Sequence, residues 1–229
     1  MKKLLFIFLI VVLGGGVAIS LPYIKLVFAS STSNFQQTIN AGSLSVDIVD
    51  SSYVTVASPA VAMGAITFSF ACQDATGTFG TNTERIYVKN PDAADSGWTV
   101  SLAASAPTAV WDSAGTDFDF NDPGTGGCVD DGVTTDVDGL GGQMTVDPSV
   151  GTLDVGQCTS CVVTNVSKGS SNAYVEGTTN SITILDAAAD SNDIGDWRLT
   201  GVAITQKVPA EQPAATDYNI NMVLSIVAK

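Results

Sequence analysis

Asp95-Ser-Gly-Trp-Thr-Val-Ser-Leu102 places Trp98, Val100 and Leu102 at alternate positions. Successive side chains of a β-strand point to opposite faces, so this spacing predicts a strand with one apolar face. Asp193-Ile-Gly-Asp-Trp-Arg-Leu199 repeats the pattern with Trp197 and Leu199. The end of the chain alternates in the same way, with large apolar residues at Tyr218, Ile220, Met222, Leu224 and Ile226.

Short strand-like runs recur along the chain, and Gly, Pro, Asn and Asp separate nearly all of them. They lie at residues 42–49, 53–57, 65–71, 85–89, 98–102, 118–121, 143–146, 181–185, 197–204 and 218–227. No run of ten residues after the N-terminal region has helical periodicity, and the Ala-rich residues 186–190 are too few for a helix. The pattern predicts an all-β fold, an antiparallel β-sandwich of the Ig-like or jelly-roll kind. Trp98 and Trp197 are expected to fill its interior, with sugar stacking on an exposed face as the alternative.

The N-terminal region has the pattern of an export signal. Lys2 and Lys3 precede an uncharged apolar run at residues 4–21. In Val27-Phe28-Ala29, Val27 and Ala29 supply the short or small residues that a signal peptidase requires at the two positions of its cleavage site. We predict a signal peptide at residues 1–29; an uncleaved hydrophobic anchor helix is the alternative, because the run is about long enough to span a bilayer. Residues 30–40 are predicted to be a flexible leader, and residues 41–229 a single β-sandwich domain that is secreted or held at the cell surface.

Composition excludes several classes of function. The 229 residues include 9 Lys and Arg against 23 Asp and Glu, a net charge of −14, which repels nucleic acids and anionic lipids. The chain has no histidine, which removes Ser-His-Asp and Cys-His nucleophiles and imidazole-based zinc chemistry. We therefore expect a protein that is not an enzyme; glycoside hydrolysis by paired carboxylates is a remote alternative.

Four cysteines form an even set, as is typical of exported proteins with disulfides. They are Cys72, Cys128, Cys158 and Cys161, and three pairings are open. Cys158-Thr-Ser-Cys161 has the spacing of a redox motif but lacks the strand-then-helix setting and a nearby cation. A zinc site would normally need a second such pair.

The acidic middle of the chain is a candidate calcium site. Asp117-Phe-Asp-Phe-Asn-Asp122 alternates oxygen ligands with Phe118 and Phe120, and a glycine-rich loop follows with four more carboxylates. Clustered hard oxygen atoms suit Ca²⁺, although the pattern is not an EF-hand. The candidate ligands are Asp117, Asp119, Asn121, Asp122, Asp130, Asp131, Asp136 and Asp138. A second acidic cluster, for which Ca²⁺ is again a candidate, consists of Asp186, Asp190, Asn192, Asp193 and Asp196. For both clusters the alternative is a solvated acidic loop without a metal.

Residues 65–229 resemble the WxL domain of bacterial surface proteins. The resemblance rests on Gly97-Trp-Thr-Val-Ser-Leu102 after Arg85-Ile-Tyr-Val-Lys-Asn-Pro91, and on Val208-Pro-Ala-Glu-Gln-Pro-Ala-Ala-Thr-Asp-Tyr218 before the last strand. The family carries two Trp-x-Leu triplets. Val100 stands where the first triplet has its leucine, and Leu224-Ser-Ile226 of the last strand stands where the family has its second triplet. Trp197-Arg-Leu199 matches the triplet but lies earlier in the chain than that last strand. The resemblance implies a secreted, β-rich protein that binds peptidoglycan or neighbouring surface proteins non-covalently.

A weaker resemblance covers the start of the mature chain. Phe35-Gln-Gln-Thr-Ile-Asn-Ala-Gly-Ser-Leu-Ser-Val-Asp-Ile48 is similar to the start of mature TasA and camelysin-like fibre proteins. That resemblance implies a jelly-roll subunit that polymerises by passing an N-terminal strand to the next copy, and a free strand can complete a neighbour's open sheet edge. An ordinary first strand within its own sheet is the alternative.

These observations predict a WxL-like structural or adhesive protein of the cell surface, in contact with wall polymer or other surface proteins. The alternative is a fibre subunit that associates with itself by strand donation. We expect contact with a membrane only through an uncleaved N-terminal segment, and no nucleic-acid partner.

Overall fold

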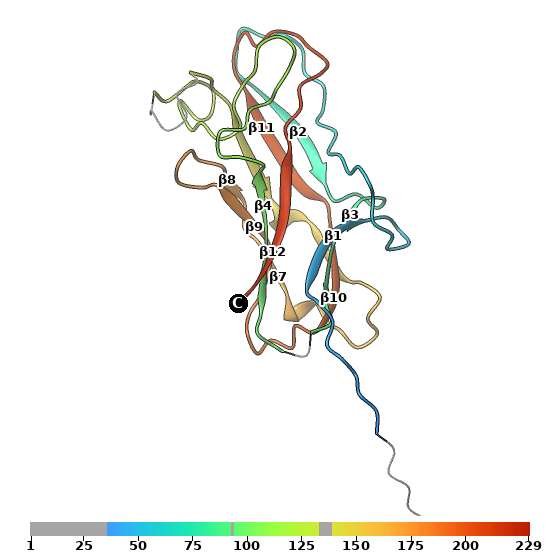
Figure 1. Cartoon of the computed structure of the whole chain (residues 1–229). Helices are drawn as coiled ribbons and strands as arrows, with labels where there is room; N and C mark the ends of the chain where they lie inside the picture. Colours follow the sequence, from blue (N-terminus) through green and yellow to red (C-terminus); the bar gives the residue numbers. More distant parts are fainter. Residues whose placement is uncertain (1–35, 93, 133–138) are drawn as a thin grey trace, which may run out of the picture. The chain divides into compact units, whose positions relative to one another are not determined.

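The computed structural model describes residues 36–92, 94–132 and 139–229 (Figure 1). The chain divides into two units, Met1–Ile39 and Asn40–Lys229. The predicted signal peptide or anchor at residues 1–29 and the first half of the predicted leader lie outside the described residues. Within the described ranges, no helix is long and apolar enough to cross a membrane.

Strands make up nearly all the regular structure of the described residues, with two short 3₁₀ helices and no α-helix. The elements in chain order are β1 (Ser45–Val49), β2 (Gln73–Phe79), β3 (Arg85–Asn90), β4 (Trp98–Ala104), β5 (Gln143–Asp147), η1 (Pro148–Val150), β6 (Thr152–Val155), η2 (Val163–Asn165), β7 (Ser167–Lys168), β8 (Asn172–Ala173), β9 (Ser181–Ala187), β10 (Gly195–Thr200), β11 (Val202–Val208) and β12 (Met222–Ala228). The predicted all-β fold is confirmed.

Three antiparallel sheets of four strands arise from these elements. Sheet A has the order β1-β3-β10-β6, sheet B the order β2-β11-β5-β8, and sheet C the order β12-β4-β9-β7. Four chain segments pass from one of sheets A and B to the other and so join them: β1 to β2, β2 to β3, β5 to β6 and β10 to β11. Gly201 interrupts the last of these segments with a φ of 77°, a left-handed conformation that favours glycine.

The core lies where the apolar face of sheet C meets sheets A and B. Trp98 of β4 packs on Trp197 of β10, with ring centroids 5.8 Å apart, and both side chains are fully buried. The same cluster includes Val100 and Leu102 of sheet C, as well as Val146 of sheet B. The expectation that the two tryptophans fill the interior agrees with this packing.

Pairing of the last strand explains why its apolar residues alternate. Leu224 lies opposite Leu102, and Ile226 opposite Val100, in the antiparallel pair of β12 and β4. Leu224 and Ile226 are half-buried, whereas Val223 and Val227 face solvent. The alternation therefore reports a strand with one covered face.

Several predicted strands differ from those observed. Residues 65–71 form no strand, and residues 53–57 and 118–121 contribute only isolated bridges. The single strand predicted at residues 197–204 is two strands, broken at Gly201. β2 was not predicted, because Gln73, Asp74, Thr76 and Gly77 hide the alternation of its two buried residues, Ala75 and Phe79.

Two valines test the assignment of the core. Val88 of β3 is fully buried and Val227 of β12 is 67% exposed. We expect Val88→Ala to lower the free energy of unfolding by about 2 kcal/mol, through lost burial and an unfilled cavity. Val227→Ala, the matched control, should change it by less than about 0.5 kcal/mol. Urea unfolding measures the free energy of unfolding of both variants. Equal losses of free energy in the two would contradict the placement of Val88 in the core.

Candidate functional site

An apolar groove of about 690 Å³ lies between β1 and β12. β1 is the edge strand of sheet A and β12 the edge strand of sheet C, where it pairs with β4. β1 pairs with β3 on one side; on its other side Val49 forms an isolated bridge with Thr55, and the carbonyl of Ile48 accepts a hydrogen bond from the backbone N–H of Val56. The two edge strands approach one another without pairing (Figure 1). We call this feature the edge groove.

Core side chains line the floor of the edge groove. Phe79, Leu102, Met144 and Ile204 belong to the main hydrophobic cluster and also line the groove. Val46 and Ile48 of β1 and Met222 and Leu224 of β12 form its two walls. An apolar strand placed there would cover the half-buried side chains of the two walls, and it would find unpaired backbone groups along the free edge of β12.

The segment that precedes β1 is exposed and forms no strand. Residues 36–43 are all exposed, and Ile39 is 90% exposed. The backbone N–H of Gly42 donates to the carbonyl of Pro91 at 3.1 Å, so the segment becomes anchored just before β1 begins. No charged residue occurs between Ser30 and Val46.

The first predicted calcium cluster is divided in the structure. Asp117 accepts a hydrogen bond from the backbone N–H of Ser113 within its own turn. Asp119 and Asn121 are buried, and Asn121 donates through Nδ2 to the carbonyl of Pro107. Asp136 and Asp138 lie outside the described residues.

Asp122, Asp130 and Asp131 do come together, with carboxylate oxygens within 4.8 Å of one another. Asp122 is buried and accepts hydrogen bonds from the backbone N–H groups of Gly124 and Asp131. Burial raises the pKa of its carboxyl, and the charges of Asp131 and Asp130 add to that rise. The carboxylate oxygens of Asp122 thus already accept backbone N–H groups of their own loop, whereas Asp130 and Asp131 are exposed to solvent.

Two disulfides settle the pairing that the sequence left open. Cys72 is bonded to Cys128 and Cys158 to Cys161, with Cα atoms 5.7 and 5.6 Å apart. Such bonds indicate an oxidising environment. The first ties the segment before β2 to the acidic loop, across 56 residues of sequence.

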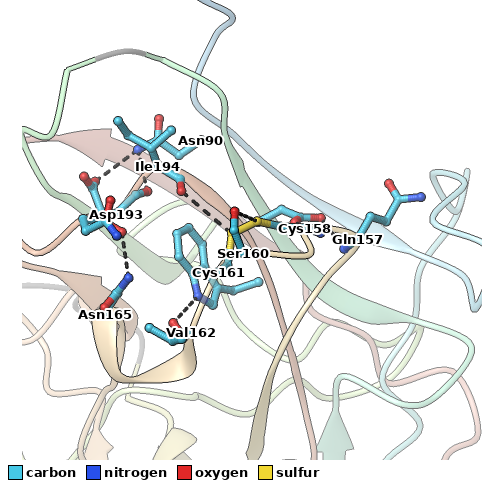
Figure 2. The surroundings of a disulfide bond; sticks show 12 residues. Asn90, Gln157, Cys158, Ser160, Cys161, Val162, Asn165, Asp193 and Ile194 are labelled. Carbon is cyan, nitrogen blue, oxygen red and sulfur yellow. Dashed lines mark hydrogen bonds between the residues drawn. A yellow bond between two sulfur atoms is a disulfide. The ribbon is translucent and has the colours of Figure 1, made fainter.

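The Cys158–Cys161 disulfide closes a small loop after β6 (Figure 2). Backbone N–H groups of Gln157 and Cys158 donate to the carboxylate of Asp196, each at 2.7 Å, and the hydroxyl of Tyr87 donates to the same carboxylate. This hydrogen bond and burial raise the pKa of Tyr87, burial being the larger cause. Cys158, Cys161 and Asp196 lie close enough to share a metal, but the two sulfur atoms are bonded to each other and are not thiolate ligands.

The residues of the WxL resemblance lie in or beside the core. Trp98, Val100, Trp197 and Leu199 are fully buried. The indole N–H of Trp197 donates to the carbonyl of Val162 at 3.1 Å, and Leu224 and Ile226 are half-buried in β12. These side chains serve packing in this structure.

The sequence reasoning did not identify the edge groove. Its walls were visible as alternating runs in the first and last strands, but alternation does not reveal which strands end up at a sheet edge. A scan against protein-family models, a search of curated proteins and a search of solved structures found no match. The groove and the segment before it therefore carry the functional argument on their own.

The two disulfides differ in the length of chain that they close. Replacing Cys72 and Cys128 by serine should lower the free energy of unfolding by about 4 kcal/mol, and replacing Cys158 and Cys161 by about 2 kcal/mol, because a longer closed loop removes more entropy from the unfolded chain. Their sequence separations are 56 and 3. Denaturant unfolding of the two double variants measures which bridge contributes more to the free energy of unfolding. A larger loss on removing the Cys158–Cys161 bridge would contradict the expected order.

Proposed function

We propose that this protein is a non-enzymatic, exported structural subunit of the cell surface, and that it assembles by placing its N-terminal segment in the edge groove of the next copy. The observation that carries the proposal is the edge groove itself, an apolar groove with core side chains at its floor and an edge strand on each side. Strand addition at a sheet edge combines backbone hydrogen bonds with side-chain pockets.

Chemistry of the N-terminal segment supports its role as the donor. Residues 36–43 are exposed and outside any strand, so they have few contacts to lose when they pair elsewhere. They carry no charge in a chain of net charge −14, so their insertion adds no repulsion between acidic copies. On insertion, the exposed side chain of Ile39 would move from water into the apolar edge groove of the next copy, and this burial favours association.

The disulfides and the composition support export and a structural role. Two disulfides fit an oxidising compartment such as the cell exterior. The absence of histidine from the sequence removes the commonest general base near neutral pH. An apolar groove supplies binding area rather than groups that make or break bonds.

Attachment to wall polymer through a WxL-like domain stays a prediction. Trp98 and Trp197 are both 0% exposed, so neither ring can stack on a sugar in this fold. Wall contact would have to use other surface residues, and the groove gives strand donation the stronger support.

A linker variant tests the donor segment. We expect replacement of residues 36–41 by a Gly-Ser linker of equal length to leave the domain folded, because all six residues are exposed. The wild-type chain should form concentration-dependent oligomers or filaments, and the linker variant should stay monomeric. Light scattering and electron microscopy read the outcome; equal assembly by both, or a wild-type chain that stays monomeric at every concentration, contradicts the proposal.

A pair of lysine variants tests the acceptor. Met222→Lys adds a charge to a wall of the edge groove, whereas Val227→Lys adds the same charge to an exposed position on the same strand. We expect only Met222→Lys to prevent assembly, with near-ultraviolet circular dichroism confirming that both variants are folded. Assembly lost equally in both would argue against the groove. Monomers that instead sediment with isolated cell walls would favour the wall-binding alternative.

A further inference from the structure

Two loops meet near the ends of β3, β4, β9 and β10 and bring two distant carboxylates together. Asp95 lies between β3 and β4, and Asp193 lies between β9 and β10. The carboxylate of Asp95 accepts hydrogen bonds from the backbone N–H groups of Asn192 and Asp193, at 2.8 and 3.0 Å. The pKa of Asp95 is lowered chiefly by its contact with the side chain of Asp193, and the bonds from the backbone N–H groups of Asp193 and Asn192 lower it further.

Asp193 is fully buried, and one of its carboxylate oxygens has no donor. Oδ2 accepts a hydrogen bond from Nδ2 of Asn90 at 3.1 Å (Figure 2), whereas Oδ1 has no hydrogen-bond partner among the described residues. The carboxyl groups of Asp193 and Asp95 are close enough to share a hydrogen bond. A buried carboxylate oxygen without a donor is costly, and a second carboxylate beside it increases that cost.

Burial raises the pKa of Asp193 to about 6, with Asp95 as the next cause and the charge of Asp92 as a smaller one. None of the groups that shift this pKa is a cation. A proton shared by the two carboxyl groups, or a cation bound between them, would satisfy Oδ1.

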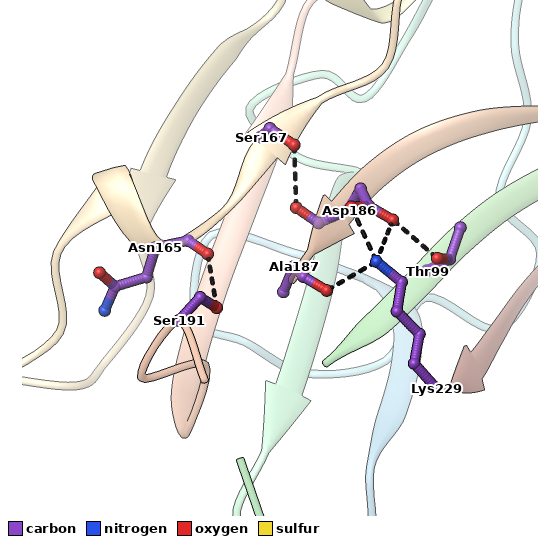
Figure 3. Close-up of polar contacts among 7 residues, drawn as sticks. All are labelled: Thr99, Asn165, Ser167, Asp186, Ala187, Ser191 and Lys229. Atoms are coloured by element: carbon purple, nitrogen blue, oxygen red, sulfur yellow. Dashed lines mark hydrogen bonds and ion pairs between the residues drawn. The ribbon is translucent and has the colours of Figure 1, made fainter. Parts of the chain in front are cut away.

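The other acidic residues of this region are already satisfied or exposed. Asp186 is paired with the amine of Lys229 at 2.8 Å and accepts a hydrogen bond from Thr99 (Figure 3). Asp196 accepts the hydrogen bonds from Tyr87, Gln157 and Cys158 described above. Asp190 faces solvent. Of the second acidic cluster of the sequence, Asp193 is the buried carboxylate with one oxygen, Oδ1, that lacks a donor among the described residues, and its partner is Asp95, 98 residues away.

We propose that Asp193 and Asp95 bind a divalent cation that prefers oxygen ligands, Ca²⁺, through Oδ1 of Asp193 and the carboxylate of Asp95. Ca²⁺ takes six to eight oxygen ligands, so water or backbone carbonyls complete the site. The cation ties the loop after β3 to the loop before β10. This site is independent of the edge groove and of the proposed strand donation.

Thermal unfolding of the purified full chain at pH 7.5 tests the proposal, with a chelator or with millimolar Ca²⁺. A ligand that binds only the folded state raises the melting temperature; for a chain of this size we expect a rise of about 5–10 °C at saturation. Asp193→Asn should abolish the rise. In chelator this variant should melt no lower than the wild type, since the substitution removes a buried charge that faces another.

Two matched variants locate the cation. Asp190→Asn removes an exposed carboxylate three residues away, and Asp122→Asn removes the buried carboxylate of the other acidic cluster. Both should keep the full response to Ca²⁺. A response that Asp122→Asn abolishes and Asp193→Asn keeps would place the ion in the other cluster and overturn the proposal. The absence of any response in the wild type would overturn it as well.

The pH dependence in chelator gives a second readout. Because the pKa of Asp193 in the folded state lies above its ordinary value, the folded state binds the proton more tightly, and stability falls as the pH rises from about 4 to about 6. The wild type should therefore gain melting temperature on going from pH 7.5 to pH 5 relative to Asp193→Asn. An identical pH dependence of the two proteins would contradict the carboxylate pair.

Discussion

The packing of Trp98 on Trp197 is the contact on which the rest of this fold depends. It joins β4 of sheet C to β10 of sheet A, and the neighbouring core residues extend the contact to sheet B. The two rings fill the largest volumes among the fully buried side chains. Because β4 and β10 are inner strands of their sheets, this contact holds the layers together at their centre. The edge strands β1 and β12 take no part in it.

The edge groove follows from that arrangement. β1 and β12 lie at the edges of their sheets and do not pair with each other, so half-buried apolar side chains of both strands line the groove between them. A sheet edge that ends beside apolar residues invites another strand. In an acidic chain that would otherwise repel its own copies, an uncharged N-terminal segment is the part best suited to provide one.

The alternation of apolar residues along the sequence predicted the core strands well, but it did not predict which strands pair with each other. Trp98, Val100 and Leu102 alternate because their strand has one buried face, and that face is visible in the sequence alone. Ile66, Phe68 and Phe70 alternate just as clearly, yet they are exposed and belong to no strand, since alternation does not supply a backbone partner. The pairing of Asp95 with Asp193 was beyond the same reasoning, because it depends on two loops that only the folded sheets bring together.

Hydrogen exchange measured on monomers and on assembled material tests the central claim most directly. Amides in exposed segments exchange rapidly, and pairing in a sheet slows them. We predict that the exposed residues 36–41, whose amides exchange rapidly in the monomer, become protected on assembly together with the amides of β12. Assembly in which residues 36–41 continue to exchange freely, while protection arises elsewhere on the domain, would contradict strand donation as the link between copies.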